Sequence, residues 1–242
     1  QMNFRGSTGY GRKHEEAGYN QWGLAMQDDI TDGVKWAIAQ GYADPKRIAI
    51  YGASYGGYAC MAGLAFTPDL YRCGINYVGV TDIALLQKTI PESWERMRAD
   101  LENKTGNSKA DRERLAETSP LKNVDRIKVP VFFAYGEQDE RVDMKHGTWM
   151  YSSLKSRGIP VEWMSRVDEG HGYRRKENVH DLYRAMEAFL AKYMTKEPVA
   201  AVTIGETKVL EMPVELVGTE KPGLRWACLN AARQDQFDQS QQ

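Results

Sequence analysis

Short apolar segments alternate with amphipathic segments along most of this chain, and this alternation limits the possible folds more than any other feature of the sequence. Four segments have the length and the β-branched or aromatic content of buried strands: 47–51, 74–80, 129–135 and 161–167. Helical periodicity follows them or precedes them at 28–38, 58–66, 144–156 and 180–194. Strands that alternate with helices form βαβ units, so the sequence predicts an α/β domain with a mostly parallel, doubly wound sheet and helices on both faces.

The two ends of the chain differ from this pattern. Residues 1–6 are expected to be the end of a strand that runs into a glycine-rich loop, so the sheet would lack its first strands. Residues 199–217 alternate only weakly, and 234–242 are polar and rich in glutamine. We therefore predict an α/β domain over residues 1–197 and a tail or small appendage of unknown role over 198–242.

The composition argues against several classes of protein. The 242 residues include 32 Lys and Arg against 33 Asp and Glu, for a net charge of −1, whereas nucleic-acid binders carry a basic excess. No apolar run reaches the roughly 18 to 20 residues that span a bilayer. The histidines and the three cysteines lack the spacing of metal ligands. We expect a soluble protein that binds no nucleic acid, membrane, metal or cofactor, with the cytoplasm favoured over the periplasm or secretion.

A GxSxG motif is the strongest chemical signal in the chain. Residues 52–56 read Gly-Ala-Ser-Tyr-Gly and stand between the strand segment 47–51 and the helical segment 58–66. In a nucleophile elbow, such a motif makes a tight strand-to-helix turn that pushes the serine hydroxyl out above the sheet. Small flanking residues let the neighbouring backbone pass close by. The placement predicts that Ser54 is a nucleophile.

A serine nucleophile needs a base to take its proton and a carboxylate to orient that base. Asp139 lies just after the strand segment 129–135, and His171 lies just after 161–167. The order serine, acid, histidine is that of α/β-hydrolases, and open α/β sheets place their sites at the carboxyl ends of strands. The sequence therefore predicts a triad of Ser54, Asp139 and His171.

Other residues are weaker candidates for the acid and the base. They are Glu140, Asp143 and Asp168 for the acid, and His14, His146 and His180 for the base. The first two acids lie further from the strand end, and Asp168 stands where a turn former is expected. The three other histidines lie in the early glycine-rich loop or on predicted helices. His171 is preferred because glycines flank it in the loop where this fold needs a base.

Several motifs together resemble the catalytic domain of the prolyl oligopeptidase family. They are Asn-Phe-Arg-Gly-Ser-Thr-Gly-Tyr-Gly at 3–11, Gln-Asp-Asp at 27–29, the elbow at 52–57, Ser-Pro-Leu at 119–121, and the segments 136–142 and 170–171. The resemblance covers about residues 3–194 and is closest to the acylaminoacyl peptidases and bacterial dipeptidyl aminopeptidases. It implies an α/β-hydrolase fold and a serine peptidase that acts on short peptides.

The resemblance also implies roles for individual residues. Ser54 matches the nucleophile, Asp139 the orienting acid and His171 the general base, while the backbone N–H of Tyr55 matches one donor of the oxyanion hole. Arg141 matches the arginine that binds a substrate carbonyl, a role that suits a planar guanidinium.

Three of the residues near the expected site have a second interpretation. Arg141 could instead pair with Glu137 or Glu140 at the surface. Val80 and Ile83 correspond to the region that lines the first specificity pocket of the family, but apolar residues at these positions are equally consistent with core packing.

The sequence also departs from the family pattern. The upstream segment that supplies the second oxyanion donor and the β-propeller that screens substrates by size are both absent from these residues. We therefore expect the chain to be the C-terminal portion of a longer polypeptide, with a β-propeller upstream. Two alternatives remain. One is an esterase, because a fold alone does not determine the substrate. The other is a truncated, non-catalytic relic that serves as an interaction module, because the upstream segment is missing.

Overall fold

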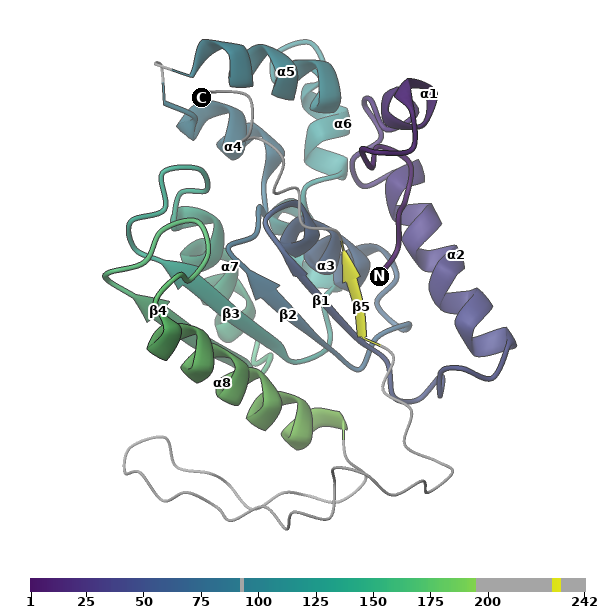
Figure 1. Ribbon diagram of the computed structural model, residues 1–242, viewed down its shortest axis with the longest axis vertical. Coiled ribbons are helices and arrows are strands. Elements are labelled where there is room, and N and C mark those ends of the chain that lie inside the picture. The colour runs from purple at the N-terminus through teal and green to yellow at the C-terminus, as the bar shows by residue number, and fades with distance from the viewer. Residues whose placement is uncertain (92–93, 195–227, 232–242) are drawn as a thin grey trace.

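A parallel sheet forms the centre of the molecule (Figure 1). The computed structural model describes residues 1–91, 94–194 and 228–231. In these residues, five strands lie in the spatial order β4-β3-β2-β1-β5, and every pair of neighbours is parallel. The strands are β1 (Ala49–Ala53), β2 (Cys73–Tyr77), β3 (Val131–Gly136), β4 (Val161–Arg166) and β5 (Cys228–Ala231). Because the strands are parallel, their carboxyl ends all lie at the same end of the sheet.

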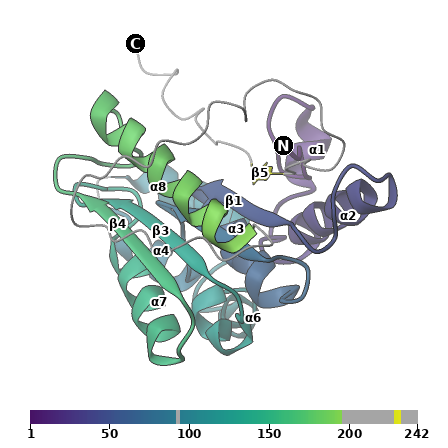
Figure 2. The same ribbon diagram turned by 90° about the horizontal axis from the view of Figure 1, so that it is seen from below.

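Helices connect the strands and cover both faces of the sheet (Figures 1 and 2). They are α1 (Arg12–Glu16), α2 (Ala25–Ala39), α3 (Tyr55–Phe66), α4 (Ile83–Thr89), α5 (Glu95–Thr105), α6 (Arg112–Glu117), the 3₁₀ segment η1 (Pro120–Arg126), α7 (Lys145–Ser156) and α8 (Lys176–Met194). The helix α8 packs on one face, and α2, α3 and α7 lie on the other. The predicted α/β fold with helices on both faces is confirmed.

The strand β3 shows how the sheet divides the hydrophobic core into two parts. Val131, Phe133 and Tyr135 pack with α3 and α7, whereas Phe132 and Ala134 face α8. Side chains of a strand point alternately to opposite faces, so a strand covered on both sides must be apolar throughout. This requirement explains the uninterrupted apolar run that marked the strand in the sequence.

The distribution of apolar residues along α3 and α8 matches the extent to which each helix is buried. The helix α3 lies at the centre of the domain, and all its residues from Tyr55 to Ala65 are buried. By contrast, α8 buries one stripe, with Leu182, Met186 and Phe189 against the sheet. Of the helices in the described part of the chain, none combines the length and the apolar character needed to cross a membrane.

Two strand predictions were wrong in their extent. The segment predicted as a strand at 74–80 ends at Tyr77, because Val78 has a φ of 45° and leaves the extended conformation. No strand forms at residues 1–6, where Met2 alone is assigned to an isolated β-bridge and the chain then turns at Arg5 and Gly6.

The strand β5 comes from the segment that the sequence analysis assigned to a tail or appendage. Its backbone pairs with β1 from Ala49 to Gly52, at the edge of the sheet away from β2. The other residues of 198–242 lie outside the described part of the chain. Their role as a tail or appendage therefore stays a prediction.

Candidate active site

Ser54 lies in the turn between β1 and α3, with φ 56° and ψ −118°. A positive φ is costly for any residue other than glycine, and the nucleophile elbow is one place where this strain is found. The turn also needs glycine at position 52, since a Cβ there would lie 2.1 Å from the carbonyl oxygen of Gly56. The Ser54 N–H donates to the carbonyl of Tyr77 at 2.9 Å, which anchors the turn to β2.

Asp139 lies in the loop between β3 and α7, residues 137–144, which we call the acid loop, and its side chain is fully buried. Its Oδ1 accepts hydrogen bonds from the backbone N–H groups of Arg141 and Val142, each at 2.9 Å. These two bonds determine the orientation of the carboxylate. The other oxygen, Oδ2, is left facing His171, with 2.8 Å between Oδ2 and Nδ1.

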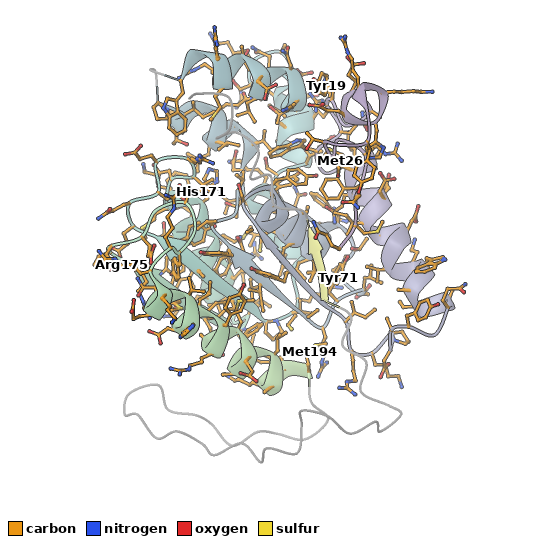
Figure 3. The ribbon with its side chains drawn as sticks, in the orientation of Figure 1. Tyr19, Met26, Tyr71, His171, Arg175 and Met194 are labelled. Atoms are coloured by element: carbon orange, nitrogen blue, oxygen red, sulfur yellow. The ribbon has the colours of Figure 1, made fainter. Side chains whose placement is uncertain are left out.

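His171 connects the acid to the serine. Its Nε2 lies 2.8 Å from Ser54 Oγ, while Nδ1 contacts Asp139. A carboxylate accepts hydrogen bonds, so Nδ1 carries a proton and the neutral imidazole presents the lone pair of Nε2 to the serine hydroxyl. In Figure 3, His171 lies in the loops beyond the carboxyl ends of the strands. The structure thus brings together all three residues predicted for the triad.

Tyr55 is the first residue of α3, directly after the serine. The first N–H groups of a helix have no partner within the helix, so the Tyr55 N–H is available for an acceptor outside it. The ring is buried and packs against Phe4, Trp22 and Tyr58, with centroid distances of 5.3, 4.6 and 5.6 Å. This aromatic packing holds the first turn of α3 in place.

The three other predicted site residues differ in their exposure. Val80 and Ile83 are 2% and 0% exposed and belong to the hydrophobic core, so their assignment to a specificity pocket stays a prediction. Arg141 is half-buried. Within the described residues its guanidinium forms no ion pair with Glu137 or Glu140, the alternative considered above.

A cavity of about 370 Å³ opens beside the acid of the triad. Its lining is formed by Thr89, Pro91, Glu137, Asp139, Glu140, Asp143 and Met144. The triad thus borders open space on the side of its acid.

The competing acids and bases lie in other environments. Asp143 pairs with Lys145 at 2.7 Å, and Asp168 pairs with Arg175 at 2.8 Å. His14 contacts the Phe4 carbonyl through Nε2 at 3.1 Å. Neither His180, exposed on α8, nor Glu140 takes part in the hydrogen-bond chain described above.

Sequence reasoning missed the part that Tyr77 plays beneath the site. This residue ends β2, where its carbonyl accepts from the Ser54 N–H and its hydroxyl accepts from the Tyr173 N–H, two residues after the base. Its ring meets that of Tyr173 edge-on at 5.4 Å. An aromatic residue in a strand gives no sequence signal for such a contact, because the partner is 96 positions away.

A second missed feature is the ion pair that holds the N-terminal loop. Both carboxylate oxygens of Asp29 accept from the Arg5 guanidinium, at 2.6 and 2.8 Å, and the Arg5 backbone N–H adds a bond of 2.9 Å. These bonds lower the pKa of Asp29. Phe4, next in the chain, is thereby kept against the ring of Tyr55.

His146 in α7 is fully buried, and its burial predicts a loss of stability in acid. Its Nδ1 accepts from the Thr81 N–H at 3.2 Å. Burial lowers its pKa to about 4, against the opposing effect of the carboxylates of Asp82, Asp143 and Asp139. Because the pKa of His146 is about 6.5 in the unfolded chain, the unfolded chain binds more protons than the folded protein between about pH 4 and 6.5.

The free energy of unfolding is therefore unaffected by His146 above about pH 6.5. It decreases as the pH falls from there towards about 4, by about 3 kcal/mol in total. We expect the midpoint of urea unfolding to fall over this interval. In His146→Gln, where the side chain still accepts a hydrogen bond but does not titrate, the fall should be markedly smaller. Parallel pH curves for the two proteins would contradict the assignment.

In the part of the chain that the structure describes, no three His, Cys, Asp or Glu side chains gather in a way that could hold a metal ion.

Comparison with known proteins places the chain in a family. The sequence profile of the prolyl oligopeptidase family matches residues 1–197. Dipeptidyl aminopeptidase BIII of Pseudoxanthomonas mexicana is 37% identical over 227 residues, which cover 92% of this chain and 32% of that protein. The acylamino-acid-releasing enzyme of Arabidopsis thaliana is 28% identical over 207 residues, which cover 79% of this chain and 26% of that protein.

Solved structures share the fold of this chain. A puromycin-hydrolyzing peptidase of Mycobacterium tuberculosis superposes with a TM-score of 0.76 at 28% identity, covering 82% of this chain and 30% of that one. An acylaminoacyl peptidase of Pyrococcus horikoshii has a TM-score of 0.74 at 23% identity, covering 83% and 32%, and this likeness shows the fold alone.

A parallel α/β sheet with a serine in a strand-to-helix elbow, facing a histidine and an aspartate, defines the class of α/β-hydrolases. Within that class, the chain belongs to the prolyl oligopeptidase family. The family resemblance seen in the sequence is confirmed, and the curated relatives include both dipeptidyl and acylaminoacyl peptidases. The chain spans less than a third of the length of these two relatives.

Proposed function

We propose that this chain carries the catalytic centre of a serine peptidase that hydrolyses peptide bonds in short peptides, of the oligopeptidase, dipeptidyl or acylaminoacyl peptidase type. The observation that supports it best is the continuous chain of contacts from Ser54 through His171 to Asp139, with 2.8 Å at both steps. The family and its peptidase relatives support the choice of a peptide substrate.

The geometry supports acyl transfer in two stages. Ser54 Oγ attacks the substrate carbonyl carbon while His171 Nε2 takes its proton, and Asp139 stabilises the imidazolium that forms. His171 then gives this proton to the leaving amine, which leaves an acyl-enzyme. In the second stage His171 takes a proton from water, the hydroxide attacks the ester, and Ser54 Oγ recovers its proton from the imidazolium.

The negative oxygen of the tetrahedral intermediate needs donors that are already in position. The Tyr55 N–H at the start of α3 supplies one of them, and the positive end of the helix dipole adds to its effect. The aromatic packing around Tyr55 keeps this donor rigid. In the whole protein, a second donor and a β-propeller that restricts substrate size would come from residues upstream of this chain.

Reaction with a fluorophosphonate tests the proposal. Such a probe phosphonylates a serine that a neighbouring base activates, so we expect one label, on Ser54, identified by peptide mass mapping. Folded protein that takes up no label would instead favour the non-catalytic relic. Cleavage of ester substrates without cleavage of any short peptide would favour the esterase.

Arg141 is proposed to bind a backbone carbonyl of the substrate. Its backbone N–H is already fixed by Asp139, and its guanidinium has no acidic partner among the described residues. A charge-assisted hydrogen bond contributes about 1.5–3 kcal/mol, so Arg141→Ala should lower kcat/KM for a short peptide by roughly 10- to 100-fold. Arg157→Ala, at the exposed C-terminal end of α7, is the matched control. Equal kcat/KM in the two variants would remove the assignment.

A further inference from the structure

Glu169 is a buried carboxylate that the proposed mechanism does not use. The residue is 3% exposed and precedes the base, His171, by two positions. It lies in the base loop, which we define as residues 167–175 between β4 and α8. A buried carboxylate is costly unless it is fully hydrogen-bonded, so its partners show what it does.

Three donors converge on this carboxylate, two from the end of the base loop and one from the first turn of α8. Oε2 accepts from the Arg174 N–H at 2.8 Å, and Oε1 accepts from the Arg175 N–H at 2.9 Å. The third donor is Nδ2 of Asn178, 2.7 Å from Oε1. Backbone N–H groups at the start of a helix have no partner inside it, and the helix dipole there favours a negative charge. Glu169 thus ties the two ends of the base loop together and, through Asn178, joins the loop to the first turn of α8.

The pKa of Glu169 agrees with a charged carboxylate. Burial by itself raises the pKa, but the hydrogen bonds from Arg174, Asn178 and Arg175 outweigh it, and the pKa lies below its usual value. The side chain is therefore ionised at neutral pH and accepts all three bonds at once.

The backbone of Glu169 also contacts the loop that carries the acid. Its carbonyl accepts from the Gln138 N–H at 2.9 Å, one position before Asp139. A Cβ at Gly136 would lie 2.4 Å from this carbonyl oxygen and 2.2 Å from that of Gly170, so the two backbones touch where β3 ends. A shift of Glu169 would therefore move the acid loop and the base loop relative to each other.

We propose that Glu169 is a positioning residue, which holds the base loop between α8 and the acid loop so that Nε2 of His171 stays within reach of Ser54. The proposal rests on the hydrolase function proposed above. In Figure 3, the labelled Arg175, directly before α8, lies on the same side of the molecule as His171.

Glu169→Gln is the decisive variant, because it keeps the size of the side chain and replaces one acceptor with an NH₂ donor. That donor would face the N–H group of Arg174, or those of Arg175 and Asn178, and the base loop would have to move. Misplacement of a catalytic group by about 1 Å costs about 100-fold, so we expect fluorophosphonate labelling of Ser54 to slow by roughly 10- to 100-fold. For a short peptide, kcat should fall by a similar factor with little change in KM.

Asp168→Asn is the matched control. Asp168 is the adjacent carboxylate, and it also contacts Arg175 and Asn178, but its side chain is 38% exposed. This variant should be labelled at the wild-type rate. Labelling of folded Glu169→Gln at the wild-type rate would overturn the proposal, whereas unlabelled wild-type protein would show that the proposed hydrolase function itself has failed.

Asn178→Ala is the second test of the positioning role of Glu169, to be used if circular dichroism shows that Glu169→Gln does not fold. This variant removes one of the three hydrogen bonds and leaves the charge of Glu169 in place. A several-fold slower labelling of the folded variant supports the positioning role, and an unchanged rate contradicts it.

Discussion

Ser54→Ala is expected to lower the turnover number for a short peptide by about 10⁶-fold, because no other group can form the acyl-enzyme. The side-chain oxygen contacts His171 Nε2, and its loss leaves the hydrogen bond from the Ser54 N–H to Tyr77 in place. The elbow should therefore keep its shape. Thermal unfolding monitored by circular dichroism should give a Tm close to that of the wild type.

Ser152→Ala on the exposed surface of α7 is a suitable control for this variant. It removes the same atom from a position that contacts no member of the triad. We expect wild-type kcat in the control and no fluorophosphonate label in Ser54→Ala. A Ser54→Ala protein with more than a hundredth of the wild-type turnover would show that another residue is the nucleophile.

Asp139→Asn is expected to lower kcat by about 10⁴-fold, the cost typical of this change in a Ser-His-Asp triad. The amide oxygen can take the place of Oδ1 and accept from the N–H groups of Arg141 and Val142. The NH₂ group then faces Nδ1 of His171 and donates to it. The proton of the imidazole must move to Nε2, which can no longer accept the proton of the serine hydroxyl.

The neighbouring Asp143 offers the matched control for the acid. It lies in the same loop, but its carboxylate pairs with Lys145 at the surface instead of contacting the histidine. Asp143→Asn should retain kcat within a few-fold of the wild type. If both variants lost activity to the same extent, the effect would belong to the charge of the loop, and the role of Asp139 as the orienting acid would be rejected.

The strand segments along the chain and the position of the elbow could be predicted because they depend on local patterns. Burial on both faces forces a strand such as 131–136 to be apolar at every position, and this is visible without coordinates. The GxSxG motif is equally local, since the glycine at 52 is needed by a contact with Gly56, four residues away. Family membership followed from several such motifs in order and is confirmed.

The end of β2 and the supporting contacts of the site could not be predicted. Val78 belongs to a residue type that favours strands, yet its φ of 45° ends β2 at Tyr77. The structure buries Val80 and Ile83 in the core, which was one of the two interpretations that the sequence left open, and their assignment to a specificity pocket stays a prediction. The contacts that Tyr77 and Glu169 make have no sequence pattern, because their partners depend on how the loops pack.

The sequence by itself thus determined the class of fold, the family, and which serine, acid and histidine to consider, since each follows from residue types near one another in the chain. Tertiary structure alone decided that Nε2 of residue 171 lies 2.8 Å from the hydroxyl of residue 54, across 117 positions. It also decided which buried carboxylate holds the loop of the base. The physical reason is that parallel strands bring distant loops to one edge of the sheet, where close packing and backbone hydrogen bonds set distances that no local pattern encodes.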